Sequence, residues 1–173
     1  MSVILLADDS PHAQRMGGRI LREEGYEVIL AAEGEEAALR LPDIDPDVVI
    51  ADAYLPGLSG LDLCRYVKSS CRHVRVILTV GSLEELDEAA AKSAGCDAVL
   101  RKPFEASVVI ATVTPLAQAA QAARKDSSAA DAGADQVRAA VARAVEAELP
   151  SLLPKIIDEV TRRVLRDMKY ARQ

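Results

Sequence analysis

Four charged side chains follow short apolar runs and could act together. Asp8 and Asp9 come directly after the first apolar run of the chain, and Asp52 comes directly after the third. Lys102 lies two residues beyond the fifth run. In an open parallel α/β sheet, the carboxyl ends of the strands meet at one edge, where ligands bind. The sequence therefore predicts that these four side chains converge.

The residue types at this edge are suited to phosphoryl transfer. Three carboxylates make an oxygen-lined site of the kind that holds Mg²⁺ with several water molecules retained. A carboxylate beside Mg²⁺ can act as a nucleophile toward a phosphoryl group, and an ammonium can pair with the transferred oxygens. We therefore expect phosphoryl transfer to an aspartate.

Five short apolar runs supply the strands that would position these residues. They are Val3–Ala7, Val28–Ala31, Val48–Ala51, Val74–Val80 and Ala98–Leu100. Four of the five are continuously hydrophobic rather than alternating, which is typical of parallel strands buried on both faces by helices. The pattern predicts five strand–helix units in one α/β domain over residues 1–124.

Capping residues predict where the intervening helices begin and end. Ser10 and Pro11 provide an N-cap and a first-turn proline for the first helix. Gly25 ends that helix before the second strand. A later helix is expected from about Leu83 to Gly95.

The last helix of the domain is expected to begin after Pro103. Thr114 followed by Pro115 resembles a second N-cap and first helical position, so the sequence predicts a kink or break there. Residues 125–136 are small and polar, which predicts a flexible linker after this helix.

Residues 137–173 carry two apolar stripes at helical spacing, and the sequence predicts two amphipathic helices separated at Pro150. This segment holds eight Lys/Arg and five Asp/Glu, whereas the whole chain has a net charge of −6. Short isolated helices are marginal in water, so these two need a covering surface. We expect self-association, or docking onto a partner protein, through residues 137–173.

Composition argues against several classes of protein. The net charge of −6, the aromatic content of 3% and the lack of a Lys/Arg-rich run argue against nucleic acid as a partner. The three cysteines have no CxxC spacing and predict neither a disulfide framework nor a zinc site. The first apolar run is too short for a signal peptide, and no later segment suggests stable membrane insertion. We expect a cytoplasmic protein.

Three motifs resemble the receiver domain of bacterial two-component response regulators. They are VILLADDSP, DAYLPGLSG and GCDAVLRKPF, and the resemblance covers about residues 1 to 122. It implies a CheY-like, flavodoxin-like doubly wound sheet with strand order 2-1-3-4-5, followed here by a C-terminal helical extension.

The resemblance also implies a role for each matching residue. Asp52 would be the phosphoacceptor, Lys102 would bind the phosphoryl group, and the bond before Pro103 would be a candidate cis peptide. The Mg²⁺ ligands would be Asp8, Asp9, Asp52 and the main-chain carbonyl of Tyr54.

The switch positions depart from the family pattern. Family members carry a Ser/Thr at the end of the fourth strand, followed by a small residue, and an aromatic residue three positions before the lysine. Either Thr79 or Val80 could occupy the first position, and we favour Val80 because Gly81 follows it. Thr79 would then point away from the phosphoryl site with its hydroxyl satisfied in the sheet. The aromatic position is Val99, so we expect a weakened or rerouted response.

We therefore expect a phosphorelay response regulator that accepts phosphate from a sensor histidine kinase or phosphotransfer protein and is not itself an enzyme. It would signal by protein–protein interaction, without a DNA-binding output domain. The alternative is a pseudo-receiver scaffold assembled through its C-terminal helices. A phosphohydrolase with an aspartate nucleophile ranks lower, because that class needs an acid/base Asp where this chain has Tyr54.

Overall fold

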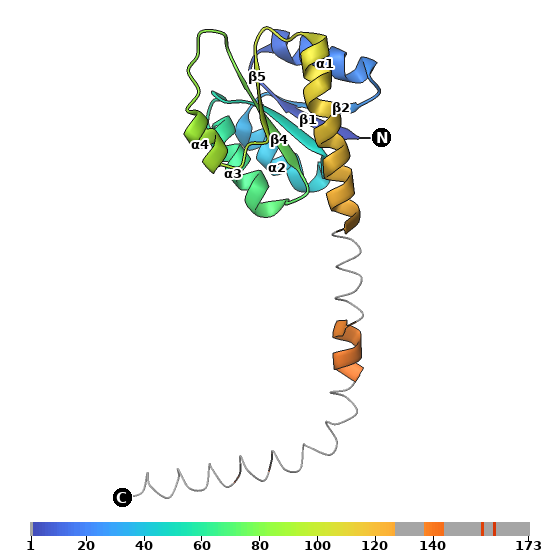
Figure 1. The fold of residues 1–173 in the computed structure, drawn as a ribbon. Helices are drawn as coiled ribbons and strands as arrows, with labels where there is room; N and C mark the ends of the chain where they lie inside the picture. The colour runs from blue at the N-terminus through green and yellow to red at the C-terminus, as the bar shows by residue number, and fades with distance from the viewer. Residues whose placement is uncertain (1, 127–136, 144–156, 158–160, 162–173) are drawn as a thin grey trace, which may run out of the picture. The chain divides into compact units, whose positions relative to one another are not determined.

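The computed structural model describes residues 2–126, 137–143, 157 and 161. The chain divides into two units, residues 1–127 and 128–173, which are treated separately below. The first unit contains the sheet and all the residues singled out for chemistry (Figure 1).

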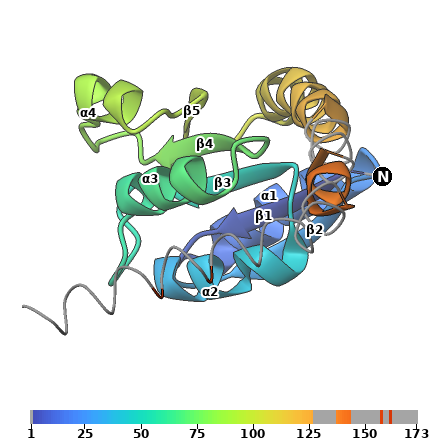
Figure 2. The same cartoon turned by 90° about the horizontal axis from the view of Figure 1, so that it is seen from below.

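Five parallel strands form one sheet in the order β2-β1-β3-β4-β5 (Figure 2). Their bounds are Val3–Ala7 for β1, Glu27–Ala31 for β2, Val48–Asp52 for β3, Arg75–Val80 for β4 and Ala98–Arg101 for β5. The predicted strand order is confirmed, and each predicted strand is present within one residue at either end. The order reverses between β1 and β3, which places the ends of these two strands at the ligand-binding crevice of the fold.

Helices cover both faces of the sheet. The helices with labels are α1 at Pro11–Glu23, α2 at Gly34–Ile44, α3 at Gly60–Ser70 and α4 at Glu88–Ser93. One hydrophobic cluster joins alternate strand residues such as Leu5 and Val49 to α2 and α3. The other joins Ile4 and Ile50 to α1 and to the helix Ala106–Asp126. Burial on both sides explains why the strand sequences are continuously apolar.

The first helix begins as predicted, whereas the predicted start of α4 is wrong. The Ser10 hydroxyl accepts a hydrogen bond from Ala13 N, with Pro11 in the first turn. In contrast, α4 begins at Glu88 and not near Leu83, because Asp87 caps it by accepting a hydrogen bond from Ala90 N at 2.9 Å. The stretch before Glu88 is a loop, which we call the 81–87 loop.

The predicted break at Thr114–Pro115 is also wrong, because one continuous helix spans Ala106–Asp126. The Thr114 hydroxyl does not cap a new helix, since it hydrogen-bonds the Tyr26 hydroxyl at 3.1 Å. Val113 and Ala117, on either side of the proline, are buried against the sheet. Their burial offsets the loss of the one main-chain hydrogen bond that Pro115 removes. The helix includes residues 125 and 126, so the predicted linker begins two residues too early.

By length and apolar composition alone, the helix Ala106–Asp126 is able to span a membrane. One side of it is instead buried in the domain, through Val109, Val113, Ala117 and Ala120. These residues recur at helical spacing, which is the pattern of an amphipathic helix that covers a sheet.

In the second unit, residues 137–143 are helical, as predicted, and Val137 and Val141 are exposed by 63% and 57%. Ile157 and Thr161 are also helical. The rest of the predicted linker and of the two C-terminal helices lies outside the described residues.

Candidate functional site

The four predicted side chains meet at the carboxyl edge of the sheet. Asp8 follows β1, Asp52 is the last residue of β3, and Lys102 follows β5. Carboxylate oxygens of Asp8, Asp9 and Asp52 lie within 4.8 Å of one another. Asp8 and Asp52 are buried, and Asp9 is exposed. The strand order brings together residues that are up to 94 positions apart in the chain.

Lys102 joins the two buried carboxylates. Its ammonium lies 2.7 Å from Asp8 Oδ2 and also contacts Asp52 Oδ2. Burial raises the pKa of Asp8, and the ammonium offsets only part of this rise. Burial acts to lower the pKa of Lys102, but its contacts with Asp52 and Asp8 outweigh burial, and its pKa is raised. Lys102 therefore carries a positive charge at the point where a phosphoryl group on Asp52 would lie.

Main-chain amides fix the orientation of both buried carboxylates. Ser10 N donates to Asp8 Oδ1 at 2.9 Å, and Tyr54 N donates to Asp52 Oδ1 at 2.8 Å. In each case the donor lies two residues after the acid, which is the geometry of an Asx turn. The turn leaves the second oxygen of each carboxylate directed to Lys102.

The acidic residues fit a magnesium ion. Oxygen ligands from carboxylates and retained waters are what Mg²⁺ prefers. Asp8 Oδ2 is buried and accepts no hydrogen bond from the described residues, although the ammonium is close, so this oxygen has spare acceptor capacity. The exposed Asp9 leaves the site open to water on one side.

Two supporting residues were not found from the sequence. Gln14 Nε2 donates to Asp8 O at 2.7 Å and to Ala31 O at 3.1 Å, which holds the ends of β1 and β2 together. Gly60 begins α3 so close to β3 that a Cβ there would lie 2.1 Å from Asp52 O. The only sequence signals were a polar residue four positions into the first helix and a glycine after a capping serine.

Tyr54 reaches from the end of β3 to the 81–87 loop. Its hydroxyl donates a hydrogen bond to the main-chain oxygen of Glu85. The Tyr54 side chain is half exposed, and its residue lies two positions after Asp52. This contact ties the loop after β3 to the loop after β4.

The structure separates Thr79 from Val80 by the face of the sheet. Strand alternation places Val80 with Leu78, toward α3 and α4, and Thr79 with Ile77, toward α1. However, Thr79 pairs in register with Asp52 and so shares its face. The prediction that Thr79 points away from the site is therefore wrong.

The prediction that the Thr79 hydroxyl is satisfied is also wrong. Oγ1 is fully buried and has no hydrogen-bond partner among the described residues. The strand pairing uses the main-chain groups of Thr79, while its side chain lies on a face occupied mostly by aliphatic side chains. Asp52 is the partner of Thr79 in register, yet the Thr79 hydroxyl makes no hydrogen bond with it.

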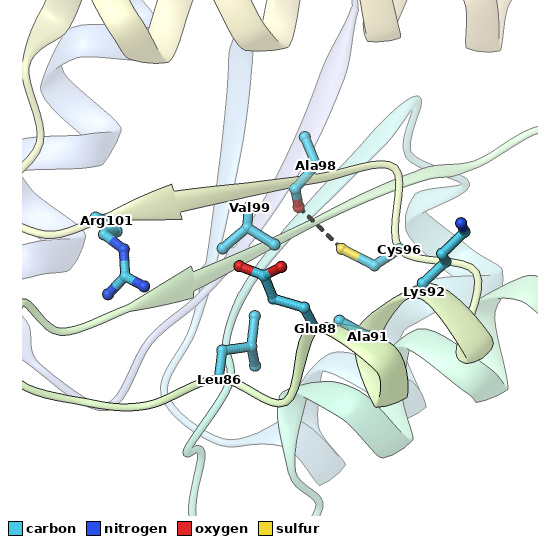
Figure 3. A pocket seen from close by; sticks show the side chains of 8 residues that line it. All are labelled: Leu86, Glu88, Ala91, Lys92, Cys96, Ala98, Val99 and Arg101. Atoms are coloured by element: carbon cyan, nitrogen blue, oxygen red, sulfur yellow. Dashed lines mark hydrogen bonds between the residues drawn. The ribbon is translucent and has the colours of Figure 1, made fainter.

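The predicted aromatic position opens onto a pocket between α4 and β5. Val99 is 41% exposed and lines a hollow of about 490 Å³. Figure 3 shows Val99 facing Leu86 and Glu88, with Arg101 at one end of the pocket. A valine leaves open the space that a ring at this position would fill.

Comparison with known proteins agrees with this geometry. Residues 4–114 match the family described as the response regulator receiver domain. The DNA-binding response regulator MtrA of Mycolicibacterium smegmatis is 29% identical over 110 residues, which are 64% of this chain and 48% of MtrA. The chain spans about half the length of the curated relatives it matches.

Solved structures of response regulators are also similar to this chain. A putative response regulator from Chloroflexus aurantiacus is 30% identical, with a TM-score of 0.64, over 68% of this chain and 98% of that one. The chemotaxis response regulator CheY4 of Vibrio cholerae is 25% identical, with a TM-score of 0.62, over 67% of this chain and 98% of that one. These similarities cover the first unit.

Proposed function

Because this chain belongs to the family of response regulator receiver domains, we propose that it accepts a phosphoryl group on Asp52 and signals through protein contacts. The observation that carries the proposal is the placement of Lys102, which contacts both buried carboxylates at the carboxyl edge of the sheet. A fixed cation there can hold the oxygens of a phosphoryl group as it is transferred.

In the proposed reaction, a carboxylate oxygen of Asp52 attacks the phosphorus of a phosphohistidine in the kinase or phosphotransfer protein. The new P–O bond forms as the P–N bond breaks, and the electron pair of the P–N bond stays on the imidazole. Tyr54 N–H holds Asp52 Oδ1 during the attack. Asp8, Asp9, Asp52 and the main-chain carbonyl of Tyr54 would hold a Mg²⁺ ion, which would supply charge neutralisation for the transferred oxygens.

The partners we propose are a sensor histidine kinase or a phosphotransfer protein, with output by protein–protein contact. Response regulator receiver domains are typically cytoplasmic, and we place this one in the cytoplasm. MtrA is named a DNA-binding protein, but this chain matches only 48% of its length. We propose that residues 137–173 provide the output here, by self-association or by docking onto a partner.

A second candidate is a scaffold whose output does not depend on phosphorylation. Val99 favours it, because a valine at this position cannot follow a phosphoryl group by ring rotation. A ligand shifts a conformational equilibrium only through contacts that differ between the two states.

Acetyl phosphate provides the test of the proposed function. The full chain and Asp52→Asn are each incubated with acetyl phosphate and Mg²⁺, and intact mass is measured. We expect an adduct of about 80 Da in the wild type, the mass of one phosphoryl group, and none in the variant. Chelation of Mg²⁺ is expected to abolish the adduct.

The outcomes separate the two candidates. If the wild type gains no adduct, the result favours the scaffold. An adduct of equal yield in Asp52→Asn places the modification elsewhere and contradicts the assignment of the phosphoacceptor.

A further inference from the structure

The Gly81 amide, just beyond β4, already binds an anion of the protein itself. Gly81 N–H donates to Glu84 Oε2 at 2.6 Å, and Glu84 N–H donates to Gly81 O at 3.2 Å. A Cβ on residue 81 would lie 2.9 Å from the same carboxylate oxygen. The glycine therefore gives the Glu84 side chain room to fold back and make a charge-assisted hydrogen bond.

This amide lies at the rim of the phosphorylation site. Gly81 lines a cavity of about 340 Å³ together with Ser10 and Lys102. Lys102 is the residue that contacts Asp52, and β4 pairs with β3 through Thr79 and Asp52. A phosphoryl group on Asp52 would thus stand between the Lys102 ammonium and the end of β4.

We propose that Glu84 competes with a phosphoryl group for the Gly81 amide, and that phosphorylation releases Glu84. This inference rests on the proposed phosphorylation of Asp52. A phosphoryl group brings a charge of roughly −1.5 to −2 and three strong acceptor oxygens. It repels the Glu84 carboxylate and can accept the amide hydrogen in its place.

Release of Glu84 would alter the pocket of Figure 3. Arg101 Nη1 donates to the main-chain oxygen of Glu84 at 3.5 Å, and Arg101 also lines that pocket. Leu86, two residues after Glu84, lines the pocket opposite Val99. The 81–87 loop therefore connects the Gly81 amide to the α4–β5 surface without using a switch hydroxyl or a ring.

Glu84→Gln is the decisive variant, and Glu85→Gln is its matched control. Both remove one negative charge from the same exposed loop, but only the Glu84 side chain bonds the Gly81 amide. The main-chain oxygen of Glu85 that accepts from Tyr54 is retained in the control.

Two measurements on the full-length chain test the proposal. In amide NMR spectra, Glu84→Gln should move the Gly81 amide proton upfield, while Glu85→Gln leaves it in place, because a neutral acceptor makes a weaker bond. With acetyl phosphate and Mg²⁺, Glu84→Gln should be phosphorylated about fivefold faster than wild type, the effect of removing an opposing contact worth about 1 kcal/mol. Glu85→Gln should react at the wild-type rate.

Each outcome decides the question. Equal rates in wild type and Glu84→Gln, or equal acceleration in both variants, overturn the role of Glu84 while phosphorylation of Asp52 stands. A wild-type chain that gains no adduct overturns the proposed function, and this inference with it. A Gly81 amide signal unchanged in Glu84→Gln shows that the contact is not made in solution and also overturns the inference.

Discussion

Thr79 shows how a single polar group can be out of place in a core. Its hydroxyl is fully buried beside Asp52, with no partner among the described residues. A buried unsatisfied hydroxyl costs about 1–3 kcal/mol of stability. Asp8 is also a buried polar residue, but the half-buried Lys102 ammonium lies 2.7 Å from its Oδ2 and compensates its charge.

We predict that Thr79→Val stabilises the protein by about 1 kcal/mol, because it removes the unsatisfied hydroxyl and keeps the shape of the side chain. The measurement is the midpoint of urea unfolding followed by circular dichroism. Val80→Thr is the control and should destabilise the protein, because it buries a new hydroxyl on the face of the sheet that packs against α3 and α4. A lower midpoint for Thr79→Val would show that the hydroxyl has a partner in solution.

The 81–87 loop and the short helix α4 follow β4. Glu84 and Tyr54 tie this loop to the site, and Asp87 ends it by capping α4. In β5, Val99 lines an open pocket. An aromatic ring at this position would fill that pocket. Val99 cannot rotate with the site as a ring would, but Arg101 at the end of β5 contacts the loop through the main-chain oxygen of Glu84.

We predict that a phosphoryl mimic acts more strongly on the loop than on β5. Beryllofluoride with Mg²⁺ should shift the amide NMR signals of residues 81–87 strongly and those of residues 98–101 by much less. The physical reason is that the loop carries the Gly81 amide beside the site, whereas residues 98–101 are reached through the contact of Arg101 with the main-chain oxygen of Glu84. Asp52→Asn serves as the control and should show no such shifts. Large shifts throughout β5 would contradict this prediction.

At the scale of the whole chain, an acidic domain precedes a basic segment. Residues 137–173 hold eight Lys/Arg and five Asp/Glu, although the chain as a whole carries −6. Two solved structures of similar fold are covered over 98% of their own length by 67–68% of this chain, so a domain of this size can stand alone. Signalling by the whole molecule would then depend on what the second unit binds.

We predict that residues 137–173 drive self-association. The full chain should elute as an oligomer in light scattering after size exclusion, whereas residues 1–126 should be monomeric. Val137 and Val141 are exposed on the described helix, and burying them against another copy removes apolar surface from water. The double variant Val137→Asp and Val141→Asp in the full chain should shift it toward the monomer.

A full chain that is monomeric at micromolar concentration would contradict this prediction and favour docking onto a different protein. If residues 1–126 alone form the same oligomer as the full chain, the association surface lies in the receiver domain instead.

The sequence alone determined the sheet and most of the site. Continuous apolar runs identified the strands, because a strand buried on both faces has no polar positions. Asp8, Asp9, Asp52 and Lys102 could be predicted together, because the carboxyl ends of parallel strands share one edge whatever the loops do. Capping residues such as Ser10 and Gly25 act locally, and they placed their helix ends correctly.

Only the tertiary structure decided the features that depend on contacts between distant segments. Pro115 looked like a break, but packing of Val113 and Ala117 on the sheet keeps the helix continuous. The face of the sheet on which the Thr79 side chain lies became clear from the register of Thr79 with Asp52 in the neighbouring strand. The contact between Glu84 and Gly81 depended on how the loop folds back. Such contacts leave little trace in local sequence, because their energy comes from groups that only the fold brings together.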